Sequence, residues 1–180
     1  MTRNQNLFLV GAVAGTSLDM IHVVSEVLHY PKPFYPWGQA IWVPFLFGMA
    51  ALVLVWGYQM VAAFVGARDP SPPASVLTES ALGFVLAYVA TGLFHDSELL
   101  LAVGLVIAWS WHSRRHPGEG CVPYALVVAL GGTIFEAVLS STGAFEYNDP
   151  DVWGVPIWLP ALYLHASLLT RAIALRYFRA

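Results

Sequence analysis

The distribution of basic residues along the chain limits its fold more than any other feature. Most of the sequence is apolar, and the basic residues fall almost entirely in alternate gaps between the apolar stretches. If six stretches cross a bilayer, seven of the eight basic residues lie on one side: Arg3, Arg68, Arg114, Arg115, Arg171, Arg176 and Arg179. Lys32 alone lies on the other side. Because cytoplasmic loops of membrane proteins carry an excess of Lys and Arg, this asymmetry predicts six spans with both termini in the cytosol.

Composition supports the same interpretation. Hydrophobic residues make up 58% of the chain and charged residues only 11%, whereas soluble proteins average about 45–50% apolar and roughly 25% charged residues. We therefore expect one all-α, polytopic membrane domain over residues 1–180. The net charge of -3 and the absence of a long basic run argue against a nucleic acid partner. A single cysteine, Cys121, excludes an internal disulfide and a multi-thiolate metal site.

Six stretches approach the roughly 20 residues that a helix needs to cross about 30 Å of hydrocarbon. They cover residues 7–30, 38–67, 75–94, 97–112, 121–145 and 153–178. The first stretch follows Arg3 as a secretory signal would, but ionisable residues interrupt it, starting at Asp19. We interpret it as a retained first helix.

Several ionisable groups fall inside these stretches. Asp19, His22, Glu26 and His29 lie within an arc of about 80° if the first stretch is helical throughout. An ionisable side chain at bilayer depth costs about 2.5–3.5 kcal/mol on insertion scales, so such groups usually face a bundle interior or a cavity. Further intramembrane polar candidates are Glu79, Glu136 and His165.

Three interpretations of this polar stripe stay open. A metal site is disfavoured, because Asp19 and His29 would be about 15 Å apart on the helix and no other stretch supplies an obvious matching pair; we expect neither a metal nor a cofactor. A structural interpretation has Asp19 and His22 bonded within the bundle, with Glu26 and His29 near head groups. In the third, Asp19 acts with Glu136 or His95 to orient the polar head of a bound lipid.

One run of residues resembles a known family. Ser141-Thr142-Gly143-Ala144-Phe145-Glu146-Tyr147-Asn148-Asp149-Pro150-Asp151, followed by Trp158-Leu159-Pro160, is similar to the luminal loop and last helix of Insig, the insulin-induced gene family. Trp42-Val43-Pro44 and Gly48 resemble the second helix of that family. The resemblance implies six membrane helices, cytosolic termini and an internal cavity that holds a sterol or similar lipid without catalysis.

The resemblance also implies individual site residues. Phe84 matches a pocket aromatic, Trp109 a tryptophan of the fourth helix, and Glu136 a glutamine of the fifth. The polar anchor of the fourth helix falls on either His95 or Glu98. His112 replaces an aspartate linked to escort-protein binding in animal members, which makes that regulation doubtful here. The expected lipid contacts are Asp19, His22, Phe84, Tyr88, His95, Glu98, Trp109 and Glu136.

These observations predict a non-catalytic lipid-binding or sensing protein of Insig type. Its ligand would be a sterol, diacylglycerol or a similar lipid, and we expect a homo-oligomer, either a trimer or a dimer. The predicted location is a bacterial inner membrane, or the endoplasmic reticulum if the source is eukaryotic. The alternative is a membrane enzyme that acts on an isoprenoid or lipid, with Asp19 and Glu136 as general acid and base. A proton-coupled transporter is less favoured, because no internal repeat is visible.

Overall fold

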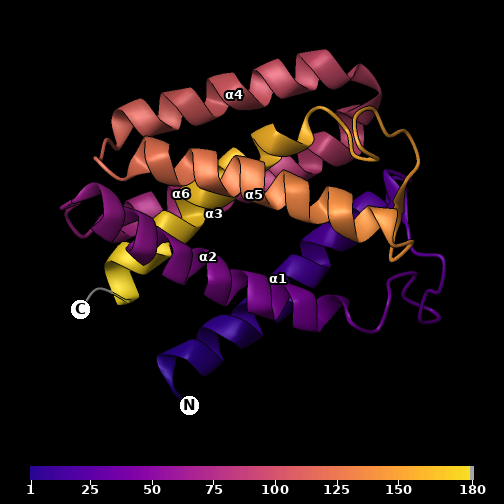
Figure 1. Cartoon of the computed structure of the whole chain (residues 1–180), viewed down its shortest axis with the longest axis horizontal. Coiled ribbons are helices and arrows are strands. Elements are labelled where there is room, and N and C mark those ends of the chain that lie inside the picture. Colours follow the sequence, from indigo (N-terminus) through magenta and orange to yellow (C-terminus); the bar gives the residue numbers. More distant parts are fainter. Residues whose placement is uncertain (179–180) are drawn as a thin grey trace.

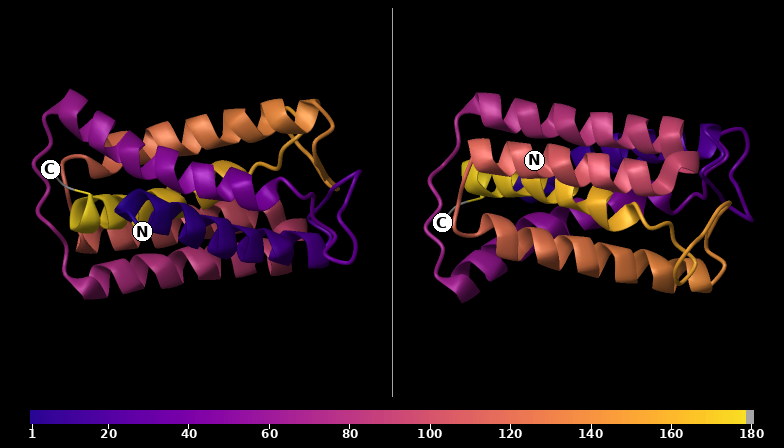
Figure 2. Two further views of the ribbon diagram at one scale, coloured as in Figure 1. Left: turned by 90° about the horizontal axis from the view of Figure 1, so that it is seen from below. Right: turned by 90° about the horizontal axis from the view of Figure 1, so that it is seen from above.

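The computed structural model describes residues 1–178 as a bundle of α-helices (Figures 1 and 2). The helices are α1 (Arg3–Val24), α2 (Val43–Val65), α3 (Ala74–Phe94), α4 (Glu98–Arg115), α5 (Cys121–Ser141) and α6 (Leu159–Tyr177). A short 3₁₀ turn, η1 (His95–Ser97), joins α3 to α4. Two short strands, β1 (Leu28–His29) and β2 (Glu146–Tyr147), pair antiparallel. Helix α6 lies at the centre and contacts α2, α3, α4 and α5.

The surface of the bundle is suited to a lipid environment. Among the described residues, α1, α2, the helical stretch Ala74–Arg115 and α5 are long and apolar enough to cross a membrane. Large apolar side chains are left exposed on them; Phe64 is 91% exposed and Leu100 is 75% exposed. Exposed apolar surface of this extent marks a membrane-embedded chain. The protein is an integral membrane protein, while six complete spans stay a prediction, because α6 does not meet the same criterion.

Local sequence signals explain several helix ends. Thr2 and Gln5 form a capping box at the start of α1, in which each side chain bonds the other residue's backbone N–H. Proline occupies the first turn of α2 and of α6, where its missing N–H costs no helical hydrogen bond. Helix α2 ends at Gly66, whose φ of 70° is readily accessible only without a side chain.

The predicted end of the first helix is wrong. Helix α1 stops at Val24, Glu26 adopts a φ of 58°, and His29 belongs to β1. Glu26 and His29 therefore leave the helix, and the predicted four-residue stripe is reduced to Asp19 and His22. The reason is that β1 pairs with β2, a long-range contact that helical periodicity does not reveal.

The limits of the last three helices also differ from the prediction. Helix α4 continues to Arg115, three residues beyond the predicted end at residue 112. Helix α5 ends at Ser141 and α6 begins at Leu159, so the loop between them is longer than expected. This loop contains Gly143 and Trp153 with positive φ and the strand β2, which explains why neither helix extends into it.

Both termini lie toward one end of the bundle (Figure 2), where arginine side chains bond to the end of α6 and to the α2–α3 loop. Arg3 Nη1 donates to the Tyr177 carbonyl at 2.8 Å, and Arg176 Nη1 donates to the Pro72 carbonyl at 3.1 Å. Lys32 follows β1 in the loops at the opposite end. Arg179 lies outside the described residues. The charge asymmetry is thus present in the structure, and the assignment of the arginine-rich end to the cytosol stays a prediction.

A buried ion pair joins the loops at this arginine-rich end. Asp69 Oδ2 accepts hydrogen bonds from Arg171 Nε at 3.1 Å, from Arg171 Nη2 at 3.0 Å and from the Tyr58 hydroxyl at 2.8 Å. Asp69 Oδ1 accepts from the Glu119 backbone N–H at 2.6 Å. Burial alone would raise the pKa of the Asp69 carboxyl, but its hydrogen bonds and the Arg171 guanidinium outweigh burial and lower the pKa. One carboxylate thus connects the α2–α3 loop, the α4–α5 loop and α6.

Candidate functional site

A small cavity lies toward the end of the bundle that carries β1 and β2, and several ionisable side chains line it. It has a volume of about 90 Å³ and is lined by residues of α1, α2, α3, α5 and α6 and by two loops. Four of the eight predicted site residues share its lining: Asp19, His22, Tyr88 and Glu136. The sequence thus identified groups that the fold brings together, although they come from three separate helices, α1, α3 and α5.

The carboxylates in this cavity are bonded to neighbouring side chains. Asp19 Oδ2 accepts from the Tyr30 hydroxyl and from Gln39 Nε2, both at 2.7 Å. Glu136 accepts from the Tyr147 hydroxyl and the Tyr163 hydroxyl, both at 2.5 Å. Hydrogen bonds of this kind compensate for the loss of water around a buried carboxylate.

The histidine of the cavity is bonded as well. His22 Nε2 lies 2.7 Å from the Thr91 hydroxyl oxygen, and its ring stacks on Tyr88 with centroids 4.8 Å apart. A volume of about 90 Å³ admits a few water molecules, at about 30 Å³ each, and not a two-chain lipid. The geometry agrees with the structural interpretation of Asp19 and His22 as groups bonded within the bundle.

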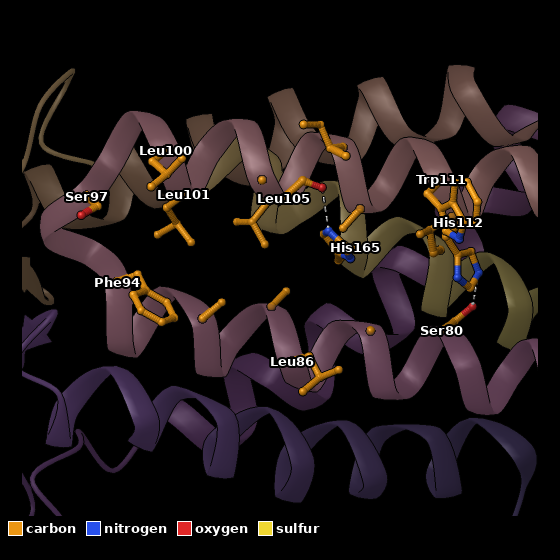
Figure 3. Close-up of a pocket in the computed structure, with 17 residues that line it drawn as sticks. Ser80, Leu86, Phe94, Ser97, Leu100, Leu101, Leu105, Trp111, His112 and His165 are labelled. Atoms are coloured by element: carbon orange, nitrogen blue, oxygen red, sulfur yellow. Dashed lines mark hydrogen bonds between the residues drawn. The ribbon is translucent and has the colours of Figure 1, made fainter.

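A much larger groove lies between α3 and α4, with α6 at its floor (Figure 3). Its volume is about 870 Å³, and its lining is mostly apolar, with side chains such as Leu86, Phe94 and Leu101. Polar side chains also reach it: His165 Nε2 lies 3.0 Å from the Leu105 carbonyl oxygen. At one end the Ser80 hydroxyl lies 3.1 Å from His112 Nε2, and Ser97 lies toward the other end (Figure 3).

The remaining four predicted site residues line neither cavity in the described part of the chain: Phe84, His95, Glu98 and Trp109. Phe84 packs edge-on against Tyr88 with ring centroids 5.2 Å apart. His95 lies in η1 and contacts Asp96 at 3.5 Å, and Glu98 begins α4. Trp109 borders a separate surface pocket beside Arg114 and Cys121. The choice between His95 and Glu98 as a polar anchor is therefore not decided by the cavities.

Sequence reasoning missed the groove. On α4 most of its lining follows spacings of three and four residues, which place one helix face toward α3: Leu100, Leu101, Gly104, Leu105, Ala108, Trp111 and His112, with Ile107 beside them. This periodicity is visible in the sequence. It does not reveal whether the face meets another helix closely or leaves an open groove, because that depends on helix separation.

Comparison with solved structures identifies the fold. The chain superposes on a mycobacterial Insig homologue, MvINS from Mycobacterium vanbaalenii, with a TM-score of 0.83 and 25% identity, over 96% of this chain and 92% of that one. A cross-linked trimeric form of MvINS gives a TM-score of 0.81 and 23% identity, over 95% and 91% of the two chains. No protein-family model and no curated protein sequence matches. The similarity that the sequence motifs predicted is confirmed: the chain has the fold of this bacterial Insig homologue.

Proposed function

We propose that this Insig-like chain binds a membrane lipid in the groove between α3 and α4, without catalysing a reaction on it. The observation that carries the proposal is the groove itself. Its volume of about 870 Å³ falls within the roughly 300–1,000 Å³ of small-molecule sites, which are mostly apolar with a few fixed polar groups. The groove combines such a lining with Ser80, His112 and His165.

The surroundings of the groove favour a lipid over a water-soluble ligand. Both helices belong to the stretch Ala74–Arg115, which is apolar enough to lie in a membrane, so the groove opens toward hydrocarbon. Acyl chains gain little by moving from lipid to an apolar groove, so shape and hydrogen bonds to the head group must provide selectivity. A hydroxyl-bearing lipid of the sterol or diacylglycerol class would present its hydroxyl to Ser80 and His112.

In this proposal Asp19 and Glu136, which line the small cavity, stabilise the fold and do not contact the lipid. Asp19 and Glu136 bond to aromatic hydroxyls from other parts of the chain, and the bond from Tyr163 to Glu136 connects α5 to α6, the floor of the groove. The proposed lipid contacts are therefore residues of α3 and α4, in place of the residues of the small cavity that the sequence predicted.

A pair of glycine substitutions tests the proposal. A Cβ atom added at Gly104 or at Gly131 would meet no atom within 4 Å, so a side chain can be added at either position without a clash at its first atom. Gly104 lines the groove, whereas Gly131 lies exposed on α5. We expect native mass spectrometry of the detergent-purified protein to show a retained lipid, reduced several-fold by Gly104→Leu and unchanged by Gly131→Leu. Equal retention in both variants would exclude the groove.

The enzyme alternative has one observation in its favour, because Asp19 and Glu136 line the same cavity. Both carboxylates are occupied by hydrogen bonds, which disfavours a role as acid and base. Incubation of the purified protein with lipid extract distinguishes the two functions. Lipid recovered unaltered supports binding, whereas a change in composition that Asp19→Asn abolishes would support catalysis.

We also propose that the chain forms a homo-oligomer. The support is the similarity to MvINS, which was crystallised as a cross-linked trimer. The mass spectrum that measures lipid retention also gives the subunit number, and three copies per particle is the expected result.

A further inference from the structure

Two histidines lie at the end of α4, His112 in its last turn and His116 directly after it. His112 and His116 are four residues apart, the spacing at which side chains lie above one another. Their ring centroids are 4.9 Å apart. The sequence prediction ended the helix at residue 112, so His116 was assigned to a loop and the pair was not recognised. Helix α4 continues to Arg115, and the backbone N–H of His116, the next residue, donates to the His112 carbonyl at 3.1 Å.

A carboxylate from the neighbouring helix completes the cluster. Glu79 on α3 has its Oε2 atom 2.9 Å from His116 Nε2. One ligand atom from each of Glu79, His112 and His116 lies within 4.8 Å of the others. All three residues are partly buried, and the His116 side chain is only 22% exposed. Two imidazoles and a carboxylate thus converge from two adjacent helices.

We propose that Glu79, His112 and His116 bind a divalent transition metal ion, with zinc as the reference ion. Two histidines and one glutamate form a known zinc ligand set that leaves a coordination position for water or a ligand. Imidazole donors favour zinc, nickel and copper over magnesium and calcium, which prefer oxygen. Metal–ligand bonds of about 2.1 Å need ligand atoms only somewhat over 3 Å apart, so small rotations of these side chains suffice.

The charges around the cluster allow a cation to bind. Arg171 lies nearby, with Nη1 3.4 Å from the His116 carbonyl oxygen, but its charge is compensated by Asp69. Arg115 is adjacent in sequence and lies at the end of α4, where the helix dipole is negative. Glu79 supplies the negative charge within the cluster itself.

The position of the cluster gives a metal a route of entry. His112 and Ser80 line both the large groove and a neighbouring cleft of about 170 Å³, and His116 lines that cleft. The proposed metal site therefore lies at the end of the groove. The inference goes beyond lipid binding and does not depend on it, since the three ligands belong to the protein alone.

The test uses the full-length, tag-free protein in detergent after chelator treatment. We expect isothermal titration with Zn²⁺ to give one saturable site per protomer, and Co²⁺ to give a visible absorption spectrum that Zn²⁺ abolishes. His112→Gln, His116→Gln and Glu79→Gln should each weaken Zn²⁺ binding at least tenfold. The control His29→Gln removes an exposed imidazole from the opposite end of the bundle and should bind like wild type.

Two further measurements keep the outcome unambiguous. Thermal unfolding without metal must show that each variant is folded, and Gly104→Leu should bind Zn²⁺ normally even where it loses lipid. Loss of zinc binding in the three ligand variants with normal folding supports the site. No saturable binding by the wild type, or wild-type affinity in His116→Gln, would overturn the proposal and leave Glu79 and His116 as an ion pair.

Discussion

Asp69 and Arg171 are 102 residues apart in the sequence and form a buried ion pair, with Asp69 Oδ2 3.0 Å from Arg171 Nη2. The Asp69 side chain is only 1% exposed and that of Arg171 10%. A buried pair is costly to form, but removal of one partner leaves the other charge without compensation. The pair therefore makes the arginine-rich end of the bundle sensitive to single substitutions.

Asp69→Asn is expected to destabilise the protein by about 3 kcal/mol, because Arg171 then stays buried without its counter-ion. Thermal unfolding in detergent measures the effect. Asp149→Asn is the matched control, since Asp149 is exposed in the loop before α6. Unfolding of Asp69→Asn at the wild-type temperature would show that the pair does not stabilise the fold.

The same pair predicts an acid-dependent loss of stability. The pKa of Asp69 is lower in the folded protein than its ordinary value of 3.8, so its contribution is complete above about pH 4. That contribution is lost as the pH falls through the lower, folded-state pKa. We expect the unfolding temperature of the wild type to fall below pH 4 more steeply than that of Asp69→Asn. Parallel pH profiles would contradict this assignment.

Gly118 allows the α4–α5 loop to approach the ion pair. A Cβ atom at this position would lie 1.8 Å from Arg171 Nη2 and 2.6 Å from Asp69 Oδ2. Gly118→Ala is therefore expected to displace the guanidinium and lower the unfolding temperature. Gly131→Ala is the control, because its Cβ would meet no atom within 4 Å and alanine stabilises a helix interior by up to about 1 kcal/mol. Opposite shifts in the two variants would support the role of Gly118.

The hydrogen bonds to Glu136 predict a further effect. Tyr163→Phe removes one of its two hydroxyl partners and leaves a buried carboxylate oxygen without that bond. A loss of about 1–3 kcal/mol is expected for such a group. Tyr35→Phe serves as a control, since Tyr35 is 90% exposed. Similar unfolding temperatures for both variants would indicate that water replaces the lost hydroxyl.

Trp109 is expected to behave in the opposite way. Within residues 1–178, its Nε1 atom is buried and has no hydrogen-bond partner. Trp109→Phe removes this unsatisfied donor and should leave stability unchanged or increased, despite the smaller ring. Retained lipid should also be unchanged, because Trp109 does not line the groove. Lower lipid retention in Trp109→Phe would indicate that Trp109 contacts the lipid, as the family resemblance implied.

The sequence predicted the parts of the fold that depend on local patterns. Apolar stretches placed the helices, and the arginine distribution separated the two ends. The path of residues 25–30 was not predictable, since Leu28 pairs with Tyr147 across the molecule. Asp69 precedes Pro70 in a loop, and no local pattern in the sequence reveals its partner Arg171 on α6.

The candidate site was predictable in its residue types more than in its geometry. Asp19, His22, Tyr88 and Glu136 meet in one cavity, but the sequence contains no information on its size. The groove depends on the separation of α3 and α4. The histidine pair depended on three extra helical residues, of which Arg114 and Arg115 are too polar to be assigned to the helix by hydropathy.

The Asp69–Arg171 contact also constrains how this protein can diverge. Loss of either side chain alone leaves the other charge buried without a counter-ion. Replacement of both by apolar groups of similar size is often tolerated. Evolutionary change at the two positions is therefore expected to be coupled, with descendants that keep both residues or neither.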